Sequence, residues 1–144
     1  MNVDKLRSLY SYIASIDPDS INLNYFRIND HCGCALGLCA MNNMFGLSGI
    51  WERLDSAYQA GMYSPVFFTS KQKYITDYFA GAFAFDLSYE EAQALFRSLT
   101  HEEYKNLISH KQMFLSRMEK LFKQKGISLF PEGEKEEVKE LETI

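Results

Sequence analysis

The sequence predicts a mostly α-helical fold, a compact single-domain bundle of about five helices with at most a minor β element. Apolar side chains recur at three- and four-residue steps through several segments, as they do along one face of a helix. Two Ser/Thr-x-x-Glu motifs also mark helix starts. The chain has 144 residues, including 11 Phe, 9 Tyr and 1 Trp, so it fits one domain with ample material for a core. We expect residues 1–130 to form this helical domain and residues 131–144 to be an acidic, disordered tail.

The first predicted helix covers residues 4–16, where apolar side chains follow helical steps. The Asp-Pro-Asp-Ser sequence at 17–20 ends it, because proline cannot continue the helical hydrogen-bond ladder. Residues 21–28 alternate at first between apolar and polar side chains, which predicts a short strand or an extended run across the core. The apolar positions of the first helix are Leu6, Leu9, Tyr10, Ile13 and Ile16.

Residues 33–45 are predicted to form a buried central helix, because this uncharged segment consists mainly of small and apolar side chains. The preceding Asn29-Asp30 pair supplies capping side chains. Farther along we expect a short helix around 51–58, followed by an irregular crossing that opens at Ser64-Pro65.

Three more helices are predicted in the C-terminal half, at residues 70–85, 88–97 and 101–125. The Ser-x-x-Glu motif at 88–91 and the Thr-x-x-Glu motif at 100–103 match the capping box, in which hydroxyl and carboxylate satisfy the first backbone amides reciprocally. These motifs predict where the last two helices begin. The expected buried stripe of the final helix is Tyr104, Leu107, Ile108, Phe114, Leu115, Met118, Leu121 and Phe122.

Charge separates the tail from the body of the chain. Residues 132–144 contain six Glu and two Lys, which accounts for the whole formal net charge of −4 and leaves residues 1–131 neutral. A neutral body gives no electrostatic reason to bind nucleic-acid phosphates. The basic segment 111–125 is the local exception, and it indicates either a solvated helix face or a stripe that binds nucleic acid or a partner. The candidate partner-binding residues are Lys111, Arg117 and Lys120.

No segment predicts secretion, a membrane span or a cofactor site. The first residues lack a basic region followed by an apolar core, so we expect a cytoplasmic protein. The apolar run Phe79–Phe85 is far shorter than the roughly 20 residues that a membrane-spanning helix needs. Gly33 and Gly37 lack both the third glycine and the preceding strand of a phosphate-binding loop, so no cofactor is expected.

Cys32, Cys34 and Cys39 form the most chemically suggestive cluster, and three interpretations stay open. They could bind zinc together with a histidine, although their spacing differs from that of usual zinc sites. Cys32 could instead be the nucleophile of a hydrolase or transferase, because a helix N-terminus favours the thiolate and a histidine could act as base. Cysteine also packs as a small hydrophobe in tight helix contacts. The histidines considered as a fourth zinc ligand are His31, His101 and His110.

Two motifs carry a resemblance to a group of proteins. Cys32-Gly33-x-x-x-Gly37 and the later segment 84–96, which reads Ala-Phe-Asp-Leu-Ser-Tyr-Glu-Glu-Ala-Gln-Ala-Leu-Phe, resemble small uncharacterised proteins of phages and prophages. The likeness covers about residues 20–125, and Asp86 stands where those proteins usually have glycine. It implies an origin in a mobile element and a place in the cytoplasm of a bacterial host, and it carries over no activity.

Function is predicted from this setting, since small helical phage proteins commonly bind host proteins. The leading hypothesis is a non-enzymatic, stoichiometric inhibitor of a host defence complex, of the anti-CRISPR kind. Its expected partner is a host protein or complex, such as a nucleic-acid-binding defence complex, rather than nucleic acid or membrane. The alternatives are a cysteine-dependent hydrolase or transferase that uses Cys32, and a zinc-stabilised regulatory domain.

Overall fold

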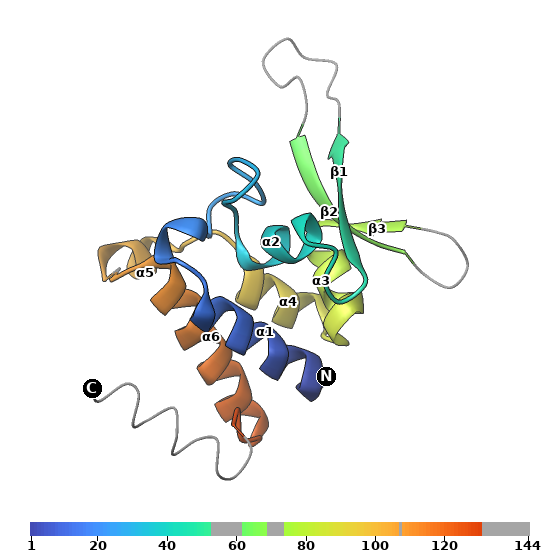
Figure 1. Ribbon diagram of the computed structural model, residues 1–144. Helices are drawn as coiled ribbons and strands as arrows, with labels where there is room; N and C mark the ends of the chain where they lie inside the picture. Colours follow the sequence, from blue (N-terminus) through green and yellow to red (C-terminus); the bar gives the residue numbers. More distant parts are fainter. Residues whose placement is uncertain (53–61, 69–73, 107, 131–144) are drawn as a thin grey trace.

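The computed structural model describes residues 1–52, 62–68, 74–106 and 108–130. They form a mostly α-helical fold with a small three-stranded antiparallel sheet of order β1-β2-β3, which confirms the predicted fold class (Figure 1). The elements in chain order are α1 (Val3–Ser15), the 3₁₀ helix η1 (Pro18–Ser20), α2 (Ala35–Met41), β1 (Leu47–Glu52), β2 (Met62–Phe68), β3 (Tyr74–Thr76), α3 (Asp77–Phe85), α4 (Tyr89–Phe96), α5 (His101–Lys105) and α6 (His110–Lys125).

The core lies where α2 meets the surrounding helices and the base of the sheet. Every residue of α2 from Ala35 to Ala40 is buried, as expected for a helix that is apolar all round. Phe85, Phe96 and Phe114 bring α3, α4 and α6 together, with ring centroids 5.8 and 6.2 Å apart along the series. Figure 1 shows α1 beside α6, and the sheet projecting from the helical body next to α2 and α3.

The glycines of the Cys-Gly-x-x-x-Gly motif allow another part of the chain to lie directly against α2. A Cβ at Gly33 would come within 2.2 Å of the Phe26 carbonyl oxygen, and one at Gly37 within 1.6 Å. Residues 21–28 make no extended strand, because Ile21 forms only an isolated bridge to Gly33. They do not form an extended run either, because the segment turns at residues 23–24, with Ile21 and Leu23 buried and Tyr25 exposed. Cys34 N–H, just before α2, donates to the Tyr25 carbonyl.

Two predictions for the middle of the chain were wrong. Residues 51–52 belong to β1 rather than to a short helix, and residues 53–58 lie outside the described part. Pro65 does not open an irregular crossing but lies within β2, opposite Gly49. It is tolerated there because β3 pairs only with Val66–Phe68, so the proline lies beyond the stretch that has neighbours on both sides.

The predicted helix at 70–85 is shorter in the structure, because Tyr74–Thr76 form β3. The helix α3 starts at Asp77, whose φ of 57° is left-handed and marks a sharp change of direction after the strand. The part of this prediction at 70–73 falls outside the described residues. The predicted helices at 4–16 and 88–97 are confirmed as α1 and α4.

The predicted helix at 101–125 is divided into α5 and α6. Both capping boxes form as predicted, at Ser88 with Glu91 and at Thr100 with Glu103. A further cap at Ser109, whose side chain accepts from Gln112 N–H, starts α6 separately. Because the chain bends between the two helices, Tyr104 and Ile108 are exposed rather than part of the buried stripe, with exposed fractions of 67% and 89%.

Candidate functional site

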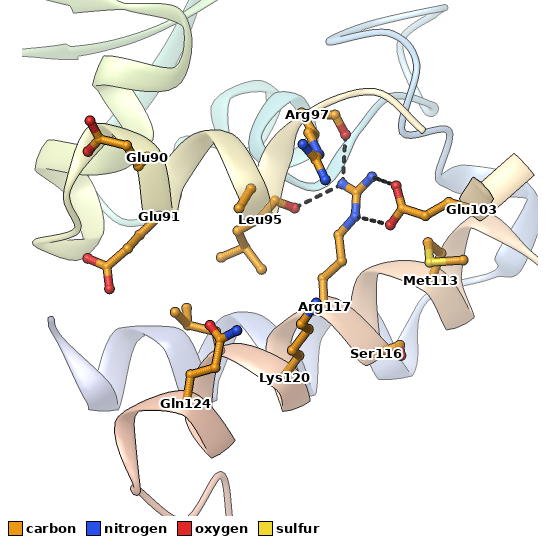
Figure 2. Close-up of a pocket in the computed structure, with 12 residues that line it drawn as sticks. Glu90, Glu91, Leu95, Arg97, Glu103, Met113, Ser116, Arg117, Lys120 and Gln124 are labelled. Carbon is orange, nitrogen blue, oxygen red and sulfur yellow. Dashed lines mark hydrogen bonds and ion pairs between the residues drawn. The ribbon is translucent and has the colours of Figure 1, made fainter. Parts of the chain in front are cut away.

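A groove of about 460 Å³ runs between α4 and α6 (Figure 2). Its apolar floor is formed by Leu95 from α4 and Leu121 from α6, both of which belong to the core. Charged side chains from α4, α5 and α6, and from the residue that follows α4, line its walls. The lining residues that bear charge are Glu90, Glu91, Arg97, Glu103, Arg117 and Lys120.

Arg117 occupies the centre of this groove as a structural clamp. Its Nε and Nη2 donate to the two carboxylate oxygens of Glu103 at 2.9 and 2.8 Å. The remaining donors reach three backbone carbonyls, those of Leu95 and Arg97 at 3.2 and 2.7 Å from Nη1 and that of Ser98 at 3.1 Å from Nη2. All five guanidinium N–H groups are therefore used, and they tie α6 to α5 and to the C-terminal end of α4.

Glu103 is fixed in its charged form by the same contacts. Hydrogen bonds from Arg117 lower the pKa of Glu103 to about 2, and the backbone N–H of Thr100 adds to this effect. The side chains of Arg117 and Glu103 are only 8% and 18% exposed. The expectation that Arg117 lies on an exposed helix face is therefore wrong. Its guanidinium points inward, where it donates hydrogen bonds to the backbone carbonyls at the C-terminal end of α4.

The other two candidate partner-binding residues differ from each other. Lys111 donates through Nζ to the carbonyl of Ile16, at 2.9 Å, and so places its positive charge at the C-terminal end of α1. Lys120 is exposed and makes no hydrogen bond or ion pair with another residue in the described part of the chain. The structure thus brings Arg117 and Lys120 to one groove. Of these two residues, Lys120 has a charge that is accessible to a ligand. Lys111 lies elsewhere and caps the C-terminal end of α1.

The three cysteines are free thiols, and burial raises the pKa of each. Cys34 lies at the N-cap of α2, where its Sγ accepts from Gly37 N–H at 3.3 Å, yet its pKa is still raised to about 11. The pKa of the half-buried Cys32 is also raised, with a contribution from Asp19. A nucleophilic cysteine needs a lowered pKa, whereas the pKa of each of these thiols is raised. Their environment is typical of cysteines that pack in a core.

No hydrogen bond between described residues joins a histidine to one of these thiols. His110 accepts from Leu23 N–H through Nδ1, at 2.9 Å, and burial, followed by the charge of Arg117, lowers its pKa. Nδ1 therefore serves as an acceptor and ties residues 21–28 to the start of α6. His31 and His101 are exposed. Within the described residues, no three His, Cys, Asp or Glu side chains are placed to hold a metal ion.

A second surface feature is a row of aromatic side chains, here called the aromatic row, formed by Phe67, Phe79, Phe83 and Tyr89. Phe79 and Phe83 are one turn apart on α3 and remain 51% and 57% exposed. Phe79 stacks on Tyr89 with ring centroids 4.3 Å apart, and Phe83 lies 6.4 Å from Phe67 of β2. The row thus joins β2, α3 and the start of α4 in one apolar surface.

The aromatic row was missed by sequence reasoning, which predicted the helix at 70–85 but no exposed aromatic surface on it. In the structure Ala82 is buried while Phe79 faces outward. The available signal was composition: α3 reads Asp-Tyr-Phe-Ala-Gly-Ala-Phe-Ala-Phe, which is apolar nearly all round. Such a helix is either buried on every side or has an apolar face left for a partner.

Comparison with known protein families, curated proteins and solved structures finds no match for this chain. None of the helices that the structure describes has the length and apolar character needed to cross a membrane. The functional interpretation therefore rests on the contacts of the described residues. The aromatic row is an exposed apolar surface that the fold itself leaves unexplained.

Proposed function

We propose that this protein acts by binding another protein through the aromatic row. The observation that carries this proposal is the exposure of Phe79 and Phe83, more than half of each, on a helix with no polar outer face. Exposing large apolar side chains to water opposes folding, and protein interfaces are enriched in such aromatic groups. Their stacking on Tyr89 and Phe67 also holds the rings in place, which reduces the entropy lost on binding.

In this proposal the bound partner is a host protein or complex, and the chain is a phage accessory protein that inhibits it stoichiometrically, of the anti-CRISPR kind. The resemblance of the Cys32–Gly37 motif and residues 84–96 to phage proteins supports the setting. The raised pKa of the thiols and the full occupation of the Arg117 donors support binding over catalysis. These groups contribute to the fold rather than to a reaction.

Capture from a bacterial lysate tests the proposal, with quantification of each retained protein. The wild-type chain should retain a specific partner, and the double variant Phe79→Ser, Phe83→Ser should lose at least about nine tenths of it, since central aromatic contacts dominate interface energies. Tyr104→Ser is the matched control, because Tyr104 is 67% exposed on α5, away from the row. If the double variant and the control retain equal amounts of the partner, the aromatic row is not part of the binding surface.

A further inference from the structure

The N-terminal end of α6 holds residues 21–28 through a histidine. Nδ1 of His110, the first residue of the helix, accepts from Leu23 N–H at 2.9 Å. The site is partly buried, and the Leu23 side chain beside it belongs to the core. An imidazole nitrogen can accept a hydrogen bond only while it carries no proton. The bond therefore depends on the neutral form of His110.

Protonation of His110 would turn this contact into an encounter of two donors. In the imidazolium both ring nitrogens carry hydrogen, so Nδ1–H would point at Leu23 N–H. No rotation of the ring restores the bond, because a doubly protonated ring has no acceptor nitrogen. The Leu23 amide would then lack an acceptor in a partly buried place, where an unpaired donor is costly.

The positive charges around the ring also disfavour the imidazolium. Arg117 lies farther along α6, and burial followed by the charge of Arg117 lowers the pKa of His110. Lys111 comes directly after His110 and places its charge at the carbonyl of Ile16. The N-terminal end of a helix bears partial positive charge as well, which opposes another cation at its first residue.

Within the described part of the chain, no carboxylate is hydrogen-bonded to the ring to offset these charges. Residues 21–28 contain one charged side chain, Arg27, which pairs with Asp30. On α5, the carboxylate of Glu103 is bound to Arg117. The other charged or titratable residues of α5 and of the connections at 17–20 and 97–100, all exposed, are Asp17, Asp19, Arg97, His101, Glu102 and Lys105.

We propose that the contact between His110 and Leu23 is an acid-sensitive latch, which holds residues 21–28 against α6 at neutral pH and releases Leu23 on protonation of the ring. The contribution of the latch to stability is complete at neutral pH and declines as pH falls below about 6.5, the ordinary pKa of histidine. The latch opens as pH passes the lower pKa that His110 has in the folded chain.

Opening of the latch has a limited extent. The same segment is also held by bonds whose groups do not titrate, since Cys34 N–H donates to the Tyr25 carbonyl at 2.7 Å and Leu99 N–H donates to Oδ1 of Asn24 at 3.0 Å. Mild acid should therefore free Leu23 from α6 while the attachment to α2 persists. The latch does not involve the aromatic row, so this inference stands apart from the proposed function.

Nuclear magnetic resonance of the full chain, titrated from about pH 7.5 to 5, tests the latch. The amide shifts of Leu23 should follow the titration of the His110 ring. Protection of the Leu23 amide against hydrogen exchange, corrected for the intrinsic pH dependence of exchange, should fall about tenfold. The Cys34 amide is the internal control and should keep its protection.

Two variants show whether the histidine is the cause. In His110→Asn the side-chain oxygen can accept from Leu23 N–H but does not titrate, so protection of Leu23 should no longer change with pH. His101→Asn is the matched control, because His101 is the exposed first residue of another capped helix, α5. This control should leave the pH response of Leu23 as it is in the wild type.

The wild-type titration decides the question even if His110→Asn does not fold. Protection of Leu23 that stays constant while the His110 ring titrates would overturn the inference, as would a pH response that persists in His110→Asn. An equal loss of protection at Cys34 would also overturn it, because acid would then be unfolding the chain as a whole rather than opening a latch.

Discussion

The groove between α4 and α6 and the aromatic row on α3 use their conspicuous side chains in opposite ways. In the groove, Arg117 and Glu103 have satisfied each other and three carbonyls, so little of their binding capacity remains for a ligand. In the row, Phe79 and Phe83 keep more than half of their surface exposed to water. A charged residue in the sequence can thus be structural while an apolar one stays exposed and available for binding, because what matters is the part of each side chain that the fold leaves unused.

The sharpest difference between the two regions should appear on removal of the clamp. Arg117→Ala leaves the largely buried carboxylate of Glu103 and three helix-end carbonyls without their donor, so the free energy of unfolding should fall by about 3 to 5 kcal/mol. Urea denaturation measures this loss. Lys120→Ala, on the same helix and exposed, is the control and should stay within about 0.5 kcal/mol of wild type. Equal effects of the two substitutions would show that Arg117 is no clamp.

Lowering the pH should reduce the stability that the Arg117–Glu103 clamp contributes and leave the aromatic row unaffected. The pKa of Glu103 is lowered to about 2 in the folded chain, so its contribution is present above the unfolded pKa of about 4.5 and is lost as pH falls toward 2. The loss from this group should be on the order of 3 kcal/mol over that range. Denaturation curves at several pH values measure it. In Glu103→Gln the slope between pH 4.5 and 2 should be smaller, and an unchanged slope would assign the acid sensitivity to other groups.

Substitutions in the row should affect binding far more than folding. Phe79→Ser with Phe83→Ser removes side chains that are only about half buried, so the loss of unfolding free energy should be about 1 to 2 kcal/mol. Partner capture should nevertheless be almost abolished. Circular dichroism during heating, together with the capture assay, separates the two effects. A loss of stability as large as that of Arg117→Ala would mean that the rings serve the core instead.

The smallest effect is expected for the exposed cation of the groove. A role for Lys120 in partner binding stays a prediction from sequence, and Lys120→Glu tests it without disturbing a contact in the described structure. If the row is the binding surface, this reversal should change partner affinity by less than about twofold, and mainly at low salt. A tenfold loss of partner affinity would show that the groove is the binding surface, and the two regions would then not differ in the way described above.

Local signals in the sequence predicted helix starts well. The capping boxes at 88–91 and 100–103 form as predicted because each depends only on residues within one turn. The sheet was missed because the residues of β2 and β3 form short apolar runs, whose pairing partners lie elsewhere in the chain. The glycines at 33 and 37 stood out, yet only the tertiary fold shows that Phe26 is what packs against them.

The candidate site was less predictable than the fold. The helical pattern gives Arg117 an outward position, and its contacts become apparent only when the ends of α4 and α5 are brought beside α6. For α3 the difficulty is the reverse, since a helix that is apolar all round contains no sign of which face is buried. Burial of Ala80 and Ala84 beside exposure of Phe79 and Phe83 is decided by the neighbours of the helix.

Titration of purified partner with the full chain tests the central claim, that the protein is a stoichiometric binder acting through the aromatic row. The proposal predicts that the partner's activity falls linearly and saturates near one chain per binding site. Cys32→Ala should reproduce that curve, and Phe79→Ser with Phe83→Ser should flatten it. Loss of partner activity at far below equimolar chain, abolished by Cys32→Ala and retained by the phenylalanine variant, would contradict the claim and establish a catalytic thiol instead.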